Sequence, residues 1–388
     1  MDNFSYFCNT RIEMGAGNSK KLADYIKMIT SGQTLLLVSD PGVVKAGIIK
    51  PLQTILEKAG YTVYLFDKLS QNPRDTECLA GAEFFNQVGA DVVIAVGGGS
   101  AMDTGKAIAL LGPNGGTPTD YLEGRKVYTN IAPIVCLPTT AGTGSEVTRS
   151  AVITESTTHR KLTLKDAALR PVLAILDPIL TMTVPKGVTA ATGVDALVHA
   201  IEGYTCNVSN PISQALGARA MQKIVSSLPL VFQDGKNEAA RFEMMEGSLL
   251  AGLCFGSSDV AAVHCLAEGL GGLYDTPHGV ANSVFLPYVL KFNAETTKEI
   301  HARLARYMSF ANDQDDDDYA VEKLVIGIQE FTKNLEIPKL KDLPGVNEDD
   351  FDRLAELALQ NGSTTSNVRV LTKEDYLNII YQAYNDSN

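Results

Sequence analysis

The chain has only five histidines, and three of them are placed where a metal ion could use them. Asp195 and His199 are four residues apart in a segment of helical pattern, which puts both side chains on one helix face. His264 lies in an apolar segment, and His278 stands in a turn-like Thr-Pro-His-Gly sequence. One carboxylate and three imidazoles suit Fe²⁺, Zn²⁺, Mn²⁺ or Co²⁺ better than Ca²⁺ or Mg²⁺. The alternative is buried histidines with ordinary partners and an Asp–His pair within one helix.

A glycine-rich turn, residues 97–100, directly follows an apolar run and precedes a helical pattern that carries Asp103 and Lys106. Glycines let the backbone approach a pyrophosphate, and the start of a helix presents free N–H groups to it. This context favours a dinucleotide site over a plain turn, although the segment is not the Gly-x-Gly-x-x-Gly fingerprint. A second loop, residues 138–146, is dense in hydroxyls and glycine. It predicts hydrogen bonds to phosphate and ribose, or a capped helix start, or both.

Asp40 ends the first apolar run of the chain. A carboxylate there can accept hydrogen bonds from both ribose hydroxyls of an adenosine, and it repels a 2′-phosphate. NAD is therefore favoured over NADP. An N-cap before Pro41-Gly42 explains the same residue equally well.

The elements that must position these residues change in kind along the chain. In the first half, expected strands at 34–39, 61–66, 91–96 and 131–137 alternate with expected helices at 44–60, 76–88 and 100–111. Such alternation predicts βαβ units, and so a parallel sheet with helices on both faces. From about Val184, helical patterns take over, at 189–204, 211–228, 237–254, 294–310, 319–335 and 349–360. We therefore predict an α/β dinucleotide-binding domain over 1–184 and an all-helical metal-binding and substrate domain over 185–388.

Composition excludes several classes of protein. The chain has 388 residues, 20% of them charged, and a formal net charge of −12. So acidic a chain has no electrostatic reason to bind nucleic acid or an anionic membrane. Its six cysteines are irregularly spaced and suggest reduced thiols rather than a disulfide framework. Neither a signal peptide nor an apolar run long enough to span a membrane is evident, so we expect a cytoplasmic protein.

Three segments together resemble the iron-containing (group III) alcohol dehydrogenase family. They are Pro138-Thr-Thr-Ala-Gly-Thr-Gly-Ser-Glu146, Ala191-Thr-Gly-Val-Asp-Ala-Leu-Val-His-Ala-Ile-Glu202 and Gly271-Gly-Leu-Tyr-Asp-Thr-Pro-His-Gly-Val280. The resemblance covers nearly the whole chain. It implies a Rossmann-like α/β domain and a helical domain, as in dehydroquinate synthase-like enzymes, with the site in the cleft between them.

The resemblance also implies cofactors and the residues that hold them. The cofactors are NAD and Fe²⁺, with Zn²⁺ or Mn²⁺ as alternatives. The implied metal ligands are Asp195, His199, His264 and His278, the last of which we also count as catalytic. The implied cofactor contacts are Asp40, Asn72, Gly97, Gly98, Gly99, Ser100, Asp103, Thr139, Thr140, Thr143, Ser145 and Lys161. A homodimer or higher homo-oligomer is the family expectation.

The sequence departs from the family near the expected substrate. Many members carry a second histidine four residues after the third ligand, where this chain has Glu268. We take Glu268 as a catalytic candidate, because a carboxylate can still relay a proton. Residues 255–259 also differ from the usual segment, and Phe255 is a candidate substrate contact. Arg149 and Ser150 follow the cofactor loop and are candidate substrate contacts, although a salt bridge explains Arg149 as well.

These features together predict an NAD(H)-linked, metal-dependent alcohol dehydrogenase or aldehyde reductase. Its substrate is a short-chain aldehyde or primary alcohol, with a polar or anionic aldehyde (sulfoacetaldehyde or succinic semialdehyde type) if Arg149 grips an anion. The metal would act as a Lewis acid on the substrate oxygen, and the nicotinamide would exchange hydride. Alternatives are a non-redox enzyme of the dehydroquinate synthase type, which also uses NAD and a metal, and a metal-bound scaffold without activity.

Overall fold

The structure, a computed structural model, describes residues 3–158 and 160–386. These residues form two compact units. The first, the α/β unit, comprises residues 8–140 and 144–184. The second, the helical unit, comprises residues 185–386 together with 3–7 and 141–143.

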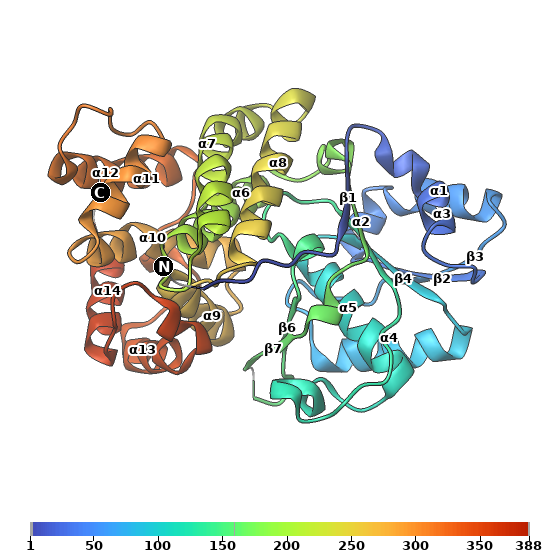
Figure 1. The fold of residues 1–388 in the computed structure, drawn as a ribbon. Helices are drawn as coiled ribbons and strands as arrows, with labels where there is room; N and C mark the ends of the chain where they lie inside the picture. The colour runs from blue at the N-terminus through green and yellow to red at the C-terminus, as the bar shows by residue number, and fades with distance from the viewer. Residues whose placement is uncertain (1–2, 159, 387–388) are drawn as a thin grey trace. The chain divides into compact units, whose positions relative to one another are not determined.

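The α/β unit is built on a six-stranded parallel sheet with the order β1-β8-β5-β4-β2-β3 (Figure 1). Its strands are β1 (Arg11–Met14), β2 (Thr34–Val38), β3 (Thr62–Phe66), β4 (Val92–Gly97), β5 (Ile134–Pro138) and β8 (Leu173–Leu176). The strands expected near 34, 61, 91 and 131 are β2, β3, β4 and β5. The expected parallel sheet is therefore confirmed, and β1 and β8 extend it along one edge.

Both faces of this sheet are covered, because successive side chains of a strand point to opposite faces. On β2, Leu35 and Leu37 pack in a core with helices α1 (Leu22–Lys27) and α3 (Ile49–Lys58). Leu36 and Val38 pack in a separate core with α4 (Asp75–Val88) and α5 (Gly99–Asn114). This two-sided burial explains why the central strands read as continuous apolar runs.

The single helix expected over 44–60 is wrong. The structure has a short helix, α2 (Pro41–Lys45), and then α3. Between them Gly47 has φ of 79°, in the left-handed region that ends a helix and that glycine adopts without strain. Both helices carry apolar residues at helical spacing, so the periodicity does not reveal the break.

An antiparallel hairpin in the α/β unit was not expected. It consists of β6 (Ser150–Thr154) and β7 (Lys161–Lys165), which form their own two-stranded sheet. Leu162 and Leu164 are buried while Thr163 is exposed. This alternation is typical of a strand with one solvent-exposed face. Each of the two strands is only five residues long and has polar neighbours. The sequence pattern therefore did not indicate a hairpin here.

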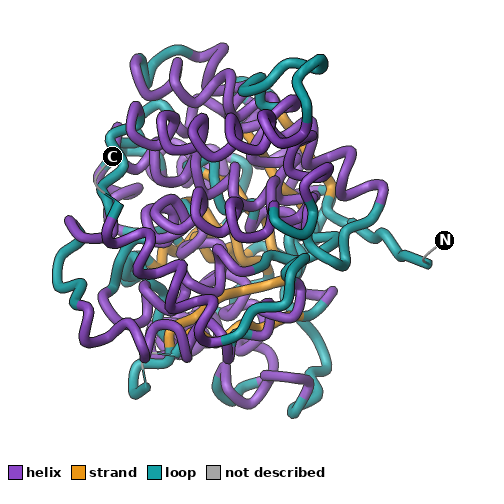
Figure 2. The backbone as a smooth tube through the Cα atoms, turned by 90° about the vertical axis from the view of Figure 1, so that its left-hand side faces the viewer, coloured by secondary structure: helices purple, strands orange, loops and turns teal. Residues whose placement is uncertain are grey.

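The described part of the helical unit contains no strand (Figure 2). Its helices are α6 (Lys186–Thr205), α7 (Pro211–Gln233), α8 (Glu238–Phe255), α9 (Ala262–Tyr274), α10 (His278–Ala294), α11 (Lys298–Tyr307), α12 (Asp317–Asn334), α13 (Phe351–Gln360) and α14 (Lys373–Asn385). Sequence periodicity predicted α6, α7, α8, α12 and α13. The helix that it predicted over 294–310 begins four residues before α11 and ends three residues after it.

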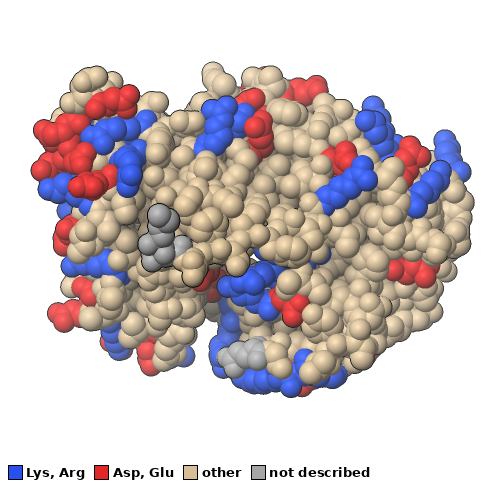
Figure 3. All heavy atoms as spheres, in the orientation of Figure 1, with Lys and Arg blue, Asp and Glu red and all other residues tan. Residues whose placement is uncertain are grey.

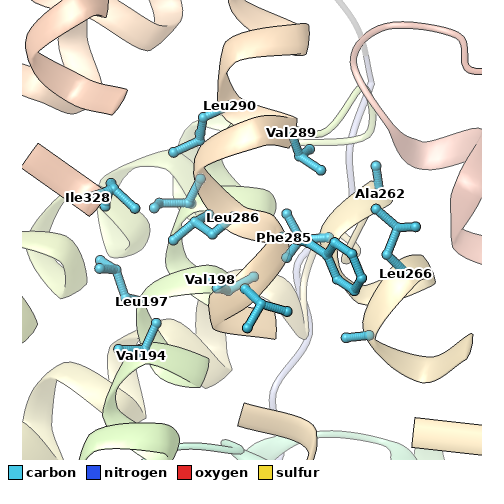
Figure 4. Close-up of a cluster of buried hydrophobic side chains, with 14 of the residues drawn as sticks. Val194, Leu197, Val198, Ala262, Leu266, Phe285, Leu286, Val289, Leu290 and Ile328 are labelled. Carbon is cyan, nitrogen blue, oxygen red and sulfur yellow. The ribbon is translucent and has the colours of Figure 1, made fainter. Parts of the chain in front are cut away.

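Three helices of this unit, α9, α10 and α14, were missed. Buried residues line α10 on all sides, so it lacks the polar stripe from which an amphipathic helix is recognised. Figure 4 shows Phe285 of α10 between Val198 of α6 and Leu266 of α9. His278, which the sequence placed in a turn, is the first residue of α10.

On the face drawn in Figure 3, charged side chains are scattered, and acidic ones gather at the upper left. The Asp315–Asp318 run leads into α12, with Asp316 as its N-cap. Arg306 pairs with Asp317 at 2.8 Å and Lys298 pairs with Asp318 at 2.5 Å. The run is thus a charged helix start. None of the helices in the described chain combines the length and apolarity that crossing a bilayer requires.

Candidate metal centre and nucleotide loop

Helix α6 carries two of the expected ligands in the interior of the helical unit. Asp195 is 2% exposed and His199 is 5% exposed. One turn of helix separates them, and Asp195 Oδ2 lies 3.9 Å from His199 Nδ1. The two side chains therefore lie on one face of α6, as their spacing predicts.

The third expected ligand comes from another helix. His264 lies near the start of α9 and is 3% exposed. One donor atom from each of Asp195, His199 and His264 lies within 4.8 Å of the others. Three side chains that are distant in sequence therefore meet at a spacing that a single ion can bridge.

His278 lies at the edge of this cluster. Its Nε2 is 3.6 Å from Asp195 Oδ1, and its ring centroid is 5.3 Å from that of His264. The side chain is 40% exposed, in contrast to the other three. The structure therefore brings all four expected ligands together, three of them buried and the fourth open to its surroundings.

The donor set fits a divalent metal. His199 Nδ1 is buried and has no hydrogen-bond partner in the described chain. Burial lowers the pKa of His199 to about 3, so its imidazole is neutral and offers a lone pair. A buried ring nitrogen without a partner is costly in a protein interior, and a metal ion supplies the missing partner.

Asp195 is ready to act as an anionic ligand. Burial would raise the pKa of its carboxyl, but the neighbouring histidines outweigh that effect and the net pKa is lowered. The carboxyl therefore remains ionised beside the imidazoles. An anionic oxygen next to nitrogen donors is the combination that Fe²⁺ and Zn²⁺ accept.

Two residues that support the ligands were not singled out from the sequence. The Glu202 carboxylate, 3% exposed, lies 2.6 Å from His264 Nδ1. Asn282, fully buried on α10, donates from Nδ2 to Asp195 Oδ1 at 2.7 Å. Glu202 lies one turn after His199 on α6, so its spacing was the available signal. Asn282 had no signal, because its contact spans 87 residues.

The expected substrate contact Phe255 and the catalytic candidate Glu268 lie close to the ligands. Phe255, at the end of α8, stacks on His199 with ring centroids 4.2 Å apart. Glu268 lies one turn after His264 on α9, on the same helix face. Glu268 Oε2 accepts a hydrogen bond of 2.7 Å from Asn361 Nδ2. The carboxylate is therefore held by an amide and remains half-buried.

The glycine turn of the α/β unit has the features of a phosphate site. Gly98 is the N-cap of α5, which has no side-chain cap and no acidic residue in its first turn. Its N–H groups are thus left for an outside acceptor. A Cβ atom on Gly98 would lie 3.4 Å from Thr140 Oγ1, a buried hydroxyl without a partner in the described chain. Uncapped backbone N–H groups beside an unpaired hydroxyl are suited to bind the phosphates of a dinucleotide.

Asp40 shows the two roles that the sequence left open. Its Oδ1 accepts hydrogen bonds from Gly42 N at 2.9 Å and Val43 N at 3.0 Å, so it caps α2. Its Oδ2 faces the glycine turn, since a Cβ atom on Gly97 would lie 3.2 Å from it. One oxygen is therefore structural, and the other lies beside the expected pyrophosphate turn.

Asp103 and Ser145 lie in an internal network. Ser145 Oγ donates to Asp103 Oδ1 at 2.6 Å, and Asp103 Oδ2 accepts from Val152 N at 2.9 Å. Lys106, fully buried, donates to Ser145 Oγ and to Ser150 O, both at 2.7 Å. This network fixes the loop at 144–148 against α5 and β6. It gives Asp103, Ser145 and Ser150 a supporting role beside any contact they make with a ligand.

The remaining expected cofactor residues are distributed over both units. Lys161 Nζ donates to Asn72 Oδ1 at 3.1 Å, so these two are neighbours. Ser100 Oγ donates to Gln71 O, and Thr139 N donates to Gly97 O at 2.9 Å. Gly99 begins α5. Thr143 is counted with the helical unit, as part of residues 141–143.

Arg149 is exposed on the α/β unit. Its side chain forms no hydrogen bond or ion pair with the residues that the structure describes, so the salt bridge considered from the sequence is absent there. Its backbone O accepts from Asp166 N at 3.1 Å. The guanidinium is therefore free to meet an outside anion.

Comparison with known proteins decides the family. The model of the iron-containing alcohol dehydrogenase family matches residues 9–178, and that of the C-terminal part of the Fe-containing alcohol dehydrogenase family matches residues 189–384. The chain belongs to the iron-containing alcohol dehydrogenase family. As a member, it is an oxidoreductase that acts on CH–OH groups, and the resemblance stated from its motifs is confirmed.

Individual family members resemble the chain over its full length. The NAD-dependent methanol dehydrogenase of Bacillus methanolicus is 34% identical over 98% of this chain and 99% of its own. A crystal structure of 1,3-propanediol oxidoreductase has a TM-score of 0.94 at 36% identity, covering 98% of this chain and 100% of its own. Sulfoacetaldehyde reductase from Bifidobacterium kashiwanohense, solved with NAD⁺, has a TM-score of 0.90 at 28% identity and covers 100% of both chains. These relatives act on different substrates, so family membership leaves the substrate open.

Proposed function

We propose that this alcohol dehydrogenase interconverts a short-chain aldehyde and its primary alcohol, using NAD(H) and a divalent iron. The helical domain, residues 185–388, would hold the metal through Asp195, His199, His264 and His278. The α/β domain, residues 1–184, would hold the dinucleotide. The observation that carries the proposal is the convergence of Asp195, His199 and His264, whose donor atoms lie within 4.8 Å of one another.

The chemistry divides between the bound groups and the chain. When bound, Fe²⁺ supplies a Lewis acid, as Zn²⁺ or Mn²⁺ would in its place, and NAD supplies the hydride carrier. The chain presents the neutral imidazole of His199 and an ionised Asp195, with His278 at the exposed edge. Phe255 covers one face of His199 and excludes water there.

Glu268 is the proposed proton-relay residue of the reaction. Asn361 holds Oε2 in place, so Oε1 can take or give a proton. The family histidine at this position would do the same with a ring nitrogen. Glu268 lies one turn after His264, near the metal-binding face of α9.

The cofactor preference follows from Asp40. Its charged Oδ2, beside Gly97, would accept hydrogen bonds from ribose hydroxyls and repel a 2′-phosphate. The remaining proposed contacts are those of the glycine turn at 97–100, Thr139, Thr140, Thr143, Asn72 and Lys161, with Asp103 and Ser145 fixing the loop.

The chemical class of the substrate is the finer part of the proposal. Arg149 and Ser150 are the candidate contacts for a carboxylate, sulfonate or phosphonate, because a guanidinium binds such groups with two parallel hydrogen bonds. The exposed and unpaired Arg149 supports this reading. An anionic short aldehyde is then preferred over a neutral one.

The test is a substrate panel with anaerobically prepared, Fe²⁺-loaded enzyme, followed by NADH and NADPH oxidation. We expect net NADH consumption with short aldehydes and little with NADPH. Comparing wild type with Arg149→Ala on charged and neutral aldehydes separates the substrate classes: a loss confined to charged aldehydes supports the anion contact, and equal losses on both end it. Metal-dependent turnover without net NADH consumption would favour a dehydroquinate synthase type of reaction, and absence of any turnover would favour a scaffold.

Two properties of the whole molecule complete the proposal. All six cysteines are free and five of them are buried, which suits a reducing compartment such as the cytoplasm. A homodimer or higher homo-oligomer is proposed from the family, and light scattering of the purified chain would measure it. Small alcohols and aldehydes are the expected partners, without nucleic acid or membrane.

A further inference from the structure

Glu202 is a buried carboxylate that the proposed chemistry does not use. It lies on α6, seven residues after Asp195 and three after His199. Both of its oxygens are engaged, although it forms no ion pair with Lys or Arg in the described chain. A carboxylate is expensive to bury without such a pair, so its hydrogen bonds need an explanation.

The first role of Glu202 is to cap α9 from another helix. The N-cap residue of α9 is Ala261, whose side chain cannot accept a hydrogen bond. Glu202 accepts from Ala261 N at 2.8 Å and from Val263 N at 2.7 Å. These are donors that a helix leaves unsatisfied at its start, and the negative charge also matches the positive end of the helix dipole.

The second role concerns His264, in the first turn of α9. Glu202 Oε2 lies 2.6 Å from His264 Nδ1. An ionised carboxylate is only an acceptor, so Nδ1 must carry the proton of that hydrogen bond. On the other side of the ring, Nε2 lies 3.3 Å from Asn282 Nδ2, an amide donor that requires an unprotonated acceptor. Both neighbours therefore select the same tautomer.

From these contacts we propose that Glu202 is a positioning residue that presents His264 Nε2 to the metal. It fixes the start of α9, sets the orientation of the imidazole ring and keeps the proton on Nδ1. Glu202 lies on the helix that carries Asp195 and His199. Its hydrogen bonds to the start of α9 therefore connect the metal ligands of the two helices. Such outer carboxylates hold histidine ligands in metal sites generally. The inference rests on the proposed metal site.

The direct measurement uses the wild-type full-length chain, labelled with ¹⁵N-histidine and loaded with Zn²⁺, which is diamagnetic. We expect the His264 ring to show a proton on Nδ1 and a metal-bound Nε2 in long-range ¹H–¹⁵N correlation spectra. The signal is assigned by its loss in His264→Asn. A proton on Nε2 of the zinc-loaded wild type would overturn the proposal, and no substitution of Glu202 is needed for that result.

The decisive variant is Glu202→Gln, which keeps the size of the side chain. A glutamine has one acceptor oxygen, so its NH₂ group must face either the α9 backbone or His264 Nδ1. Facing His264, it would force the proton onto Nε2 and block metal binding. We expect Zn²⁺ affinity, measured by chelator competition, to fall about 10- to 100-fold. Glu202→Asp, which keeps the carboxylate, should show a smaller loss of Zn²⁺ affinity.

A matched control separates metal positioning from capping. Asp177 is also buried and accepts hydrogen bonds from two distant backbone donors, Gly17 N at 2.9 Å and Ser19 N at 3.1 Å, but from no histidine. Asp177→Asn should lower the melting temperature without changing Zn²⁺ affinity. If Glu202→Gln also lowers only the melting temperature, Glu202 is merely structural. If wild type itself binds no Zn²⁺, the proposed metal site fails, which is a separate outcome.

Discussion

The amide of Asn282 donates to Asp195 Oδ1 at 2.7 Å, and the same nitrogen lies 3.3 Å from His264 Nε2 and 3.2 Å from His278 Nε2. Three of the four expected metal donors thus face one buried side chain on α10. The amide has two hydrogens, so beside Asp195 it can donate to one ring nitrogen at a time, and only while that nitrogen is unprotonated. A metal ligand must likewise be an unprotonated nitrogen, so this contact favours the form of the ring that can bind a metal.

The first prediction concerns this residue. Asn282→Asp replaces the donor with a second carboxylate beside Asp195, and like charges at that distance repel each other. We expect the metal-free variant to melt at a lower temperature than wild type, and the metal-loaded variant to recover most of the difference, because a divalent ion neutralises both carboxylates.

Asn293 on the same helix provides the control. It forms a buried pair with Asn367, with hydrogen bonds of 2.8 and 3.1 Å. Asn293→Asp should lower the melting temperature equally with and without metal. Differential scanning fluorimetry at several Zn²⁺ concentrations measures both variants. A metal response of Asn282→Asp no larger than that of Asn293→Asp would count against the role of Asn282.

The second prediction is the effect of metal removal. An ion that binds only the folded chain stabilises it by about 4 kcal/mol when free metal is 1,000 times Kd. Treatment with a chelator should therefore abolish aldehyde reduction and lower the melting temperature, and added Fe²⁺ should restore both. Asp195→Asn should behave like the stripped wild type and fail to respond to metal. Full activity in a chain shown to be metal-free would contradict the proposal.

The third prediction separates the two roles of Asp40. Asp40→Asn keeps a capping side chain for α2 but removes the charge. It should raise the ratio of kcat/KM for NADPH over NADH by about tenfold, equal to about 1.4 kcal/mol. Asp40→Ala should change the ratio similarly and also lower stability by about 1 kcal/mol, because Gly42 N and Val43 N lose their acceptor. An unchanged ratio in both variants would leave Asp40 as a cap alone.

The fourth prediction concerns Glu268. Glu268→Gln keeps the contact with Asn361 but cannot take a proton, so kcat/KM for aldehyde reduction should fall about 100-fold. Glu268→His, which restores the usual family residue, should recover much of the activity with an altered pH profile. Glu356→Gln, a substitution at the helix surface of α13, serves as the control. Wild-type activity of Glu268→Gln at every pH would exclude the relay.

The fifth prediction is a pH dependence of stability from Glu146, which is 3% exposed. Burial raises its pKa from 4.5 to about 7. The folded chain therefore holds this proton more tightly than the unfolded chain. The associated stability is fully present below about pH 4.5, and it is lost as the pH rises through 7.

A neutral residue at this position removes the penalty. Glu146→Gln should be more stable than wild type at pH 8, by up to about 3 kcal/mol, and should lose that advantage at pH 4.5. Chemical denaturation of the cofactor-free chain at several pH values measures the difference. A constant difference across this range would show that Glu146 does not titrate on unfolding.

Some of this protein follows from the sequence because the relevant physics is local. Asp195 and His199 must share a helix face once their segment is helical, and an apolar run before three glycines predicts a strand leading into a phosphate-binding turn. The alternation of strand and helix patterns likewise predicts the parallel sheet. These relationships depend on spacings of a few residues, which the chain displays directly.

Tertiary packing decided the rest. Glu202 meets His264 across 62 residues and Asn282 meets Asp195 across 87, because α6, α9 and α10 pack around one core. No local period predicts such contacts, and α10 was missed because buried residues surround it. The sequence by itself therefore determined which side chains could bind a metal. The packing of three helices determined which other residues hold those side chains in place.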